Sequence, residues 1–360
     1  MRGEAIYLFA FDIAYELIRP LPAQLLGQPV VQFNVNASRR NPRQLLFYKP
    51  EMVRLPVEER VGPRGPVLIE TVVKILPIGA ISIAIRVPFA VTGLSDLDEF
   101  HDVSFANASL ADEARILAGR VLDELRTHAV RPAATFHDEE PYTVFCLRPP
   151  VAGFRDAAAW LDQHRAEVAS LLTQEIETPL AAQEVAESTS RALSYFEDDL
   201  LVIDWEAALL VDEPADAAET LHVIELANLQ LAELEAYDRH LDEVLERSYR
   251  DVRGQSVRRR REIIRELREL QIDLTRFHDE LSNITKFFGD WHLARVYESV
   301  AARFHLEDWH RTVERKLRTL GELHELLKSE QSSRWMMILE ATIVLLFVID
   351  IVMLFLGLKR

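Results

Sequence analysis

Histidine and carboxylate side chains are the groups in this sequence that could transfer protons or bind a metal ion. They gather at three places: the run HDEE at 137–140, three histidines around Asp308, and three aspartates near residue 200. The members of the second and third groups are His292, His305, His310, Asp198, Asp199 and Asp204.

None of these groups has the spacing of a known catalytic or metal site. A metalloprotease helix needs two histidines four residues apart with a glutamate between them, and the three histidines lack that arrangement. The run at 137–140 is typical of an acidic turn before a strand, and the aspartates are typical of strand edges. The sequence has no GxxxxGK[ST], no strand-linked GxGxxG and no GxSxG. We therefore predict a protein that is not an enzyme and has no cofactor or metal, with a hydrolase built around His137 as an alternative.

A basic cluster interrupts a chain whose formal net charge is −17. Residues 253–265 contain six arginines and one glutamate. Positive charge at a helix start opposes the helix dipole, so local helix stability does not explain the cluster. Three interpretations stay open: pairing with glutamates of a neighbouring helix, contact with anionic lipid headgroups, and contact with RNA or the ribosome. The arginines are Arg253, Arg258, Arg259, Arg260, Arg261 and Arg265.

The most apolar segment runs from Trp335 to Leu358 and contains only two charged residues. A helix of these 24 residues would be about 36 Å long, enough to cross about 30 Å of bilayer hydrocarbon. One basic residue precedes the segment and two follow it, so both ends have cations that can reach lipid headgroups. The sequence therefore predicts a transmembrane helix over 335–358, with the lipid bilayer as a partner.

The two charged residues of this segment are Glu340 and Asp350. Glu340 is near enough to Arg334 to pair at the membrane interface. Asp350 lies close to the helix midpoint, where a charged aspartate costs about 3 kcal/mol, so it should be protonated, paired or turned toward another helix. We expect both residues to make intramembrane contacts in a homo-oligomer. The alternatives are that the apolar helix simply tolerates them, or that they belong to a proton or ion path.

The N-terminus has neither the uncharged stretch of a secretory signal nor the composition of an organellar transit peptide. We therefore expect a single-pass protein of the cell inner membrane with most of the chain on the cytoplasmic side. Cys146 is the only cysteine, which excludes an intrachain disulfide. The acidic net charge argues against a general nucleic-acid binder.

The first 212 residues alternate short β-rich runs with turn signals and two helical stretches, near 107–129 and 154–176. Because the strands follow one another rather than alternating with helices, we expect an α+β head with a largely antiparallel sheet over 1–212. The predicted strands are 5–11, 30–35, 44–49, 67–76, 80–89, 142–147 and 200–205.

From about residue 215 onward, glycine and proline nearly vanish and long amphipathic patterns begin. Apolar residues between 263 and 291 alternate by four and three, which is the heptad seam of coiled coils. We expect a helical stalk or bundle over 213–334, a bend near 304–309, and the membrane helix after it. If the helix over 256–289 runs away from the membrane and the next one returns, the arginine cluster lies near the bilayer surface.

Three stretches of the C-terminal half resemble the "required for meiotic nuclear division" family, also called domain of unknown function 155. They are SYFEDDLLVIDWEAALLVD at 194–212, ELANLQLAELEAYD at 225–238, and the stretch 283–327 that precedes the apolar segment. The resemblance covers roughly residues 140–350 and implies a membrane-anchored, self-associating protein with no established catalytic activity. Its most specific positions are Gly289, Asp290, Arg295, Tyr297, Trp309 and Lys316.

These observations lead to one main hypothesis, a membrane-anchored, non-catalytic scaffold or adaptor that forms homo-oligomers. The alternative is a membrane tether that binds RNA or the translation machinery through the arginine cluster. Substituting Arg258 to Arg261 by glutamine discriminates between them, since it should weaken ribosome binding in one case and liposome binding in the other.

Overall fold

The computed structural model describes residues 1–33, 50–105, 108–133, 139–175, 178–253, 265, 272 and 291–355. The chain divides into two compact units. The first contains Met1–Tyr237 and Phe277–His310, and the second contains Asp238–Arg276 and Arg311–Arg360. The long helices α4 (Pro214–Arg253) and α7 (Leu306–Phe355) each begin in the first unit and continue in the second.

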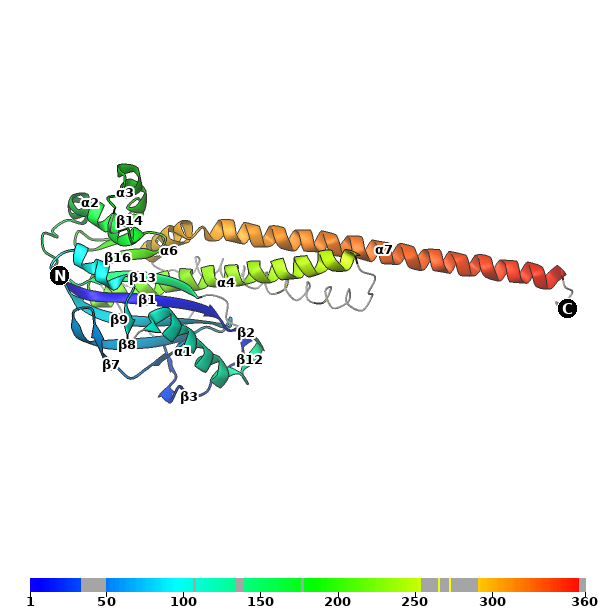
Figure 1. Cartoon of the computed structure of the whole chain (residues 1–360), viewed down its shortest axis with the longest axis horizontal. Coiled ribbons are helices and arrows are strands. Elements are labelled where there is room, and N and C mark those ends of the chain that lie inside the picture. The colour runs from blue at the N-terminus through cyan, green and yellow to red at the C-terminus, as the bar shows by residue number, and fades with distance from the viewer. Residues whose placement is uncertain are drawn as a thin grey trace. The chain divides into compact units, whose positions relative to one another are not determined.

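Within the described residues, the first unit is built on a ten-stranded sheet in the order β14-β15-β16-β13-β1-β9-β8-β6-β5, with β7 also paired to β8 (Figure 1). Only the β13–β16 pairing in this sheet is parallel. The bounds are β1 Arg2–Asp12, β5 Val31–Gln32, β6 Glu51–Arg54, β7 Glu58–Gly62, β8 Gly65–Ile75, β9 Ala80–Ala90, β13 Glu140–Leu147, β14 Ala192–Leu193, β15 Leu200–Ile203 and β16 Ala207–Val211.

The central strands are buried on both faces. In β1, Tyr7 and Phe9 join the main hydrophobic core, together with buried residues of α1 (Leu110–Leu125) and α2 (Ala157–Thr173). Ala10, at the next position of β1, packs on the other face with residues of α4. Since side chains alternate across a strand, covering both faces explains why β1 is apolar at nearly every position.

Local sequence signals begin the two helices of the main core. The hydroxyl of Ser109 accepts a hydrogen bond from the amide of Asp112 at the start of α1. The carboxylate of Asp156 accepts one from the amide of Ala159 at the start of α2. Such N-caps satisfy amides that have no partner inside the helix.

The remaining described elements are short except for α6. They are β2 Ala14–Leu17, β3 Gln24–Leu25, β4 Gln28–Pro29, η1 Ser95–Phe100, β10 Ser104–Phe105, β11 Ala108–Ser109, β12 Ala129–Pro132, α3 Ala182–Ser188 and α6 Trp291–Arg303.

The mixed α/β architecture with a large, mainly antiparallel sheet confirms that part of the predicted fold class. Strands form in five of the predicted runs, as β1, β8, β9, β13 and β15. The strand predicted at 30–35 is shortened to β5, and the one at 44–49 lies outside the described residues. The predicted bend near 304–309 is confirmed, because α6 ends at Arg303 and His305 has a positive φ of 51° before α7. The heptad seam at 263–291 lies mostly outside the described residues, so the coiled-coil bundle stays a prediction.

Candidate functional site

The apolar segment predicted to cross a membrane lies at the C-terminal end of α7. Its window Met336–Met353 has a mean hydropathy of 2.5, and none of it is buried. Glu340 and Asp350, the two residues predicted to make oligomer contacts, are both exposed on this helix. At 100° per residue, ten residues of helix place them about 80° apart around the axis, on neighbouring faces.

The arginine cluster lies largely outside the described residues. Arg253 is the last residue of α4, and Arg265 is helical and exposed. Arg258, Arg259, Arg260 and Arg261 are not among the described residues. The choice among glutamate pairing, lipid contact and RNA contact therefore stays open.

The residues that carried the family resemblance do not form one site. Gly289 and Asp290 lie outside the described residues. Arg295 lies on the exposed side of α6, with its guanidinium 5.3 Å from the centroid of the Trp291 ring. Tyr297 is buried, and its hydroxyl donates a hydrogen bond to the side chain of Gln230 in α4. Trp309 is half-buried in the first turn of α7.

Lys316 has a clear structural role within the second unit. Its Nζ lies 2.6 Å from a carboxylate oxygen of Asp238 and 2.7 Å from one of Asp242. Desolvation lowers the pKa of Lys316, but hydrogen bonds to the two aspartates raise it by more, so the net shift is upward. The two aspartates are four residues apart on α4, which places them on one face of that helix. The ammonium group therefore joins α4 to α7.

The first half of α4 has an unusual pattern of burial. Every residue from 219 to 234 is buried, although apolar side chains occupy only part of this stretch. A helix buried on all sides is normally apolar all round, because each buried polar group needs a partner. The buried polar residues here are Glu219, Thr220, His222, Glu225, Asn228, Gln230 and Glu233.

Glu225 forms the centre of the most connected of these contacts. Its carboxylate accepts hydrogen bonds from the ammonium of Lys74 in β8 and, at 2.6 Å, from the hydroxyl of Ser82 in β9. The Lys74 ammonium also lies 4.1 Å from the centroid of the Phe33 ring, and that ring is 4.8 Å from His222. A cavity of about 250 Å³ borders the pair.

The charges of this cluster are fixed rather than poised for proton transfer. Burial raises the pKa of Glu225, but the charge of Lys74 and the contacts with His222 and Lys74 together lower it by more, to about 2. Burial and the Lys74 ammonium lower the pKa of His222, which favours its neutral form. A general acid or base needs a pKa near the working pH, so this arrangement is better suited to holding α4 on the sheet than to catalysis.

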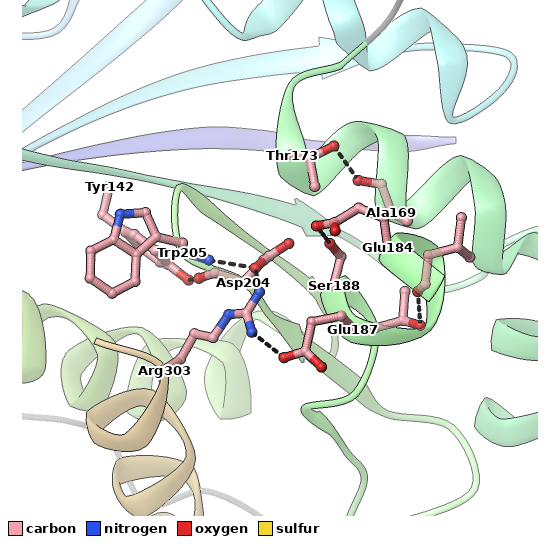
Figure 2. A network of polar contacts seen from close by, with 11 residues as sticks. Tyr142, Ala169, Thr173, Glu184, Glu187, Ser188, Asp204, Trp205 and Arg303 are labelled. Atoms are coloured by element: carbon pink, nitrogen blue, oxygen red, sulfur yellow. Dashed lines mark hydrogen bonds and ion pairs between the residues drawn. The ribbon is translucent and has the colours of Figure 1, made fainter. Parts of the chain in front are cut away.

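A second buried ion pair links α6 to the edge of the sheet. The guanidinium of Arg303 donates to the carboxylate of Asp204, which follows β15, and at 3.0 Å to the carboxylate of Glu187 in α3 (Figure 2). The backbone carbonyl of Asp204 accepts a hydrogen bond from the hydroxyl of Tyr142 at 3.0 Å. The network thus connects α3, α6, β13 and the turn after β15 (Figure 2).

The groups first considered for catalysis are dispersed. His137 lies outside the described residues, and Glu139 pairs with Arg115 at 2.7 Å. His292 is buried with its ring 5.1 Å from that of Tyr195, whereas His305 is exposed. The carboxylate of Asp199 accepts hydrogen bonds from the backbone amides of Tyr195 and Phe196. This agrees with the prediction that the aspartate lies at the edge of a strand.

Sequence reasoning missed the Lys74–Glu225 pair. In β8, Glu70, Val72 and Lys74 share one face, and two charged residues on one face of a strand normally indicate that this face meets solvent. The available signal was the strand β9 beside it, where Ser82 is the only polar residue in an otherwise apolar run from 80 to 85.

The comparisons place the chain in a family of uncharacterised proteins. It belongs to the family described as "Uncharacterized protein MJ0711, N-terminal domain", whose model matches residues 2–218. That region contains every described strand, from β1 to β16, and ends within the first turns of α4.

One relative in this family is the uncharacterized protein MJ0711 of Methanocaldococcus jannaschii, which is 22% identical over 215 residues. The aligned region covers 59% of this chain and 65% of the relative. No solved structure matches the chain. Neither the family nor this relative is described by the name of the meiotic nuclear division family, so the resemblance over 140–350 stays a prediction.

Proposed function

We propose that this protein is a membrane-anchored scaffold that self-associates, with α7 crossing the bilayer through residues 336–353. The observation that carries the proposal is the exposure of a largely apolar helix surface at the end of α7. Fourteen of the 18 residues in this window are large apolar side chains, each with 42–69% of its surface exposed.

Such an apolar surface is unfavourable in contact with water. Leaving one large apolar side chain fully in water rather than burying it costs about 1.5–3 kcal/mol. Because these fourteen side chains are only about half exposed, their exposure amounts to at least about 10 kcal/mol. The length of the apolar helix matches the hydrocarbon layer of a bilayer, because 18 helical residues span about 27 Å and that layer is about 30 Å thick.

Self-association follows from the position of Asp350. A charged carboxylate near the middle of the hydrocarbon costs about 3 kcal/mol, and contact with helices of neighbouring copies reduces that cost. Hydrogen bonds between membrane helices contribute about 1 kcal/mol each, which is enough to favour an oligomer once the copies are confined to one membrane. Glu340 lies on the neighbouring face of the helix. There it adds a second polar contact between copies, closer to the membrane interface.

The proposed location is the inner membrane, with the sheet unit on the cytoplasmic side. The arginine cluster at 253–265 supports this orientation, because the cytoplasmic leaflet carries anionic lipids that attract basic segments. Contact of these arginines with anionic headgroups would strengthen the attachment by about 1 kcal/mol per residue.

Alkaline extraction of membranes tests the anchor. The full chain should stay in the membrane pellet after a carbonate wash, whereas Leu345→Arg combined with Val348→Arg should release it. Each arginine near the centre of a spanning helix costs about 3 kcal/mol of insertion free energy.

Val61→Arg combined with Leu68→Arg is the matched control, because both residues are well exposed, at 78% and 60%, on the β7–β8 hairpin. The control should stay in the pellet like the unmodified chain. Recovery of the unmodified chain in the wash supernatant would overturn the proposal, as would retention of the Leu345/Val348 variant in the pellet.

A further inference from the structure

A cavity of about 310 Å³ lies in the first unit, away from α4's contact with Lys74. Its walls come from β1, the start of α1, β13 and the segment that follows η1. The aromatic residues Tyr7 and Phe9 line it, and Thr143 of β13 contributes a polar group. The cavity is large enough for a ligand of about ten to fifteen heavy atoms, although it is at the small end of ordinary ligand sites.

His101 is the unusual member of the lining. Only 6% of its side chain is exposed, yet neither ring nitrogen has a hydrogen-bond partner among the described residues. The nearby carboxylate oxygen of Asp98 is 3.9 Å from Nε2, beyond hydrogen-bond distance. Buried polar groups are almost always paired, so an unpaired imidazole beside a cavity indicates that something else supplies the partner.

The charged residues that line the cavity favour a ligand with a positive charge. Asp102 and Glu206 line the cavity and are exposed, which places two carboxylates at its mouth. No lysine or arginine is present among the described residues that line it. The start of α1 would favour an anion through its dipole, but Asp112 and Glu113 in its first turn offset that field.

The imidazole of His101 is also in the protonation state that can accept a hydrogen bond. Burial lowers the pKa of His101 to about 4, so the ring is neutral at pH 7. A neutral imidazole has one nitrogen that accepts a hydrogen bond and one that donates. A positively charged ring would repel a cation, and the neutral ring does not.

We propose that this cavity is a binding site for a small primary ammonium ion with an aromatic or apolar body. The ammonium group donates to the imidazole of His101 and is attracted by Asp102 and Glu206, while Tyr7 and Phe9 contact the apolar body. The chemistry is that of an organic amine. Phosphates and carboxylates are excluded by the two acidic groups at the mouth.

Calorimetric titration of the full chain in nanodiscs tests the site with three probes that share one skeleton: phenethylammonium, 2-phenylethanol and phenylacetate. Empty nanodiscs give the background of partitioning into lipid. Phenethylammonium should bind at least about tenfold more tightly than the alcohol, since a charge-assisted hydrogen bond is worth a factor of that order, and phenylacetate should not bind.

Two variants locate the binding. Glu206→Gln, at an exposed position that folding tolerates, should weaken phenethylammonium binding about tenfold. His101→Phe keeps the edge contact with the ring of Phe145, 5.2 Å away, but removes both nitrogens, and should abolish binding. Glu59→Gln, at an exposed position outside the cavity, should leave the affinity unchanged.

Three results would overturn the proposal: no binding of phenethylammonium, equal binding of the alcohol or of phenylacetate, or affinity unaffected by both the Glu206 and His101 substitutions. None of these results bears on the membrane anchor, because the wash experiment measures α7 alone.

Discussion

Replacing Glu225 by glutamine tests whether the buried Lys74–Glu225 pair holds α4 on the sheet. Glutamine keeps the shape of the side chain and can still accept a hydrogen bond from Ser82, but it removes the negative charge. The Lys74 side chain is only 11% exposed, so its ammonium would lose its carboxylate partner in a place that water reaches poorly. Breaking one partner of a buried pair usually costs about 3–5 kcal/mol.

The electrostatics of the site give a magnitude of the same order. The pKa of Glu225 falls from 4.5 to about 2 in the folded protein. At about 1.4 kcal/mol for each tenfold change in proton affinity, the ionised carboxylate contributes about 3 kcal/mol to the free energy of unfolding. We expect Glu225→Gln to lose most of this amount.

Hydrogen exchange is the suitable assay, because a chain with two compact units does not unfold in one step. Amides in β8, β9 and the first part of α4 report opening of this contact. A loss of about 3 kcal/mol should accelerate their exchange about a hundredfold.

Glu70→Gln is the matched control on the same strand. Glu70 pairs with Arg54 at 2.6 Å, but 60% of the arginine side chain and 34% of the glutamate side chain are exposed. Exposed pairs contribute at most about 1 kcal/mol, so exchange should accelerate by less than about tenfold. If Glu225→Gln has no larger effect than Glu70→Gln, the reasoning about the buried pair is wrong.

The pair also predicts a dependence on pH with a definite sign. Because the folded-state pKa of Glu225 is lowered, its contribution to stability is fully present above about pH 4.5, the unfolded value, and is lost as the pH falls toward 2. In Glu225→Gln, the stability of α4 on the sheet should lose that component of its acid sensitivity.

Three further predictions concern other parts of the chain. Gly79→Ala should cost at least about 2 kcal/mol of unfolding free energy, measured by exchange of the β1 and β9 amides, since Gly79 has a φ of +90° and an added Cβ would lie 1.6 Å from the carbonyl oxygen of Ala14. The imidazole of His101 binds a proton near pH 6.5 in the unfolded chain but only near pH 4 in the folded protein, so the native protein loses stability as the pH falls through this range. His101→Phe should therefore make the free energy of unfolding less sensitive to pH between 6.5 and 4. An unchanged pH profile would contradict the burial of this ring. Asp350→Leu should leave the chain in the membrane pellet but reduce crosslinked oligomers in native membranes, and unchanged crosslinking would reject the intramembrane contact.

Features that depend on neighbouring residues in the sequence were the ones that could be predicted. The β-rich runs at 80–89 and 5–11, bounded by turn signals, predicted β9 and β1, because strand and turn signals are local. The largely apolar segment 335–358, with only two charged residues, likewise predicted a helix, which the structure has as the end of α7. Glycine 79 could be recognised as part of a turn, but its close approach to Ala14 could not.

Only the tertiary structure decided which polar residues are buried. Lys74 and Glu225 are 151 residues apart, and Asp204 and Arg303 are 99 apart. From the neighbouring sequence alone, each of these charged residues is expected to be exposed to solvent. Burying one of them without a partner costs more free energy than interactions with its sequence neighbours contribute. Partners from distant strands and helices remove that cost, and they are specified by the topology of the sheet. The same holds for His101, whose solitary burial beside a cavity has no counterpart in the spacing of the sequence.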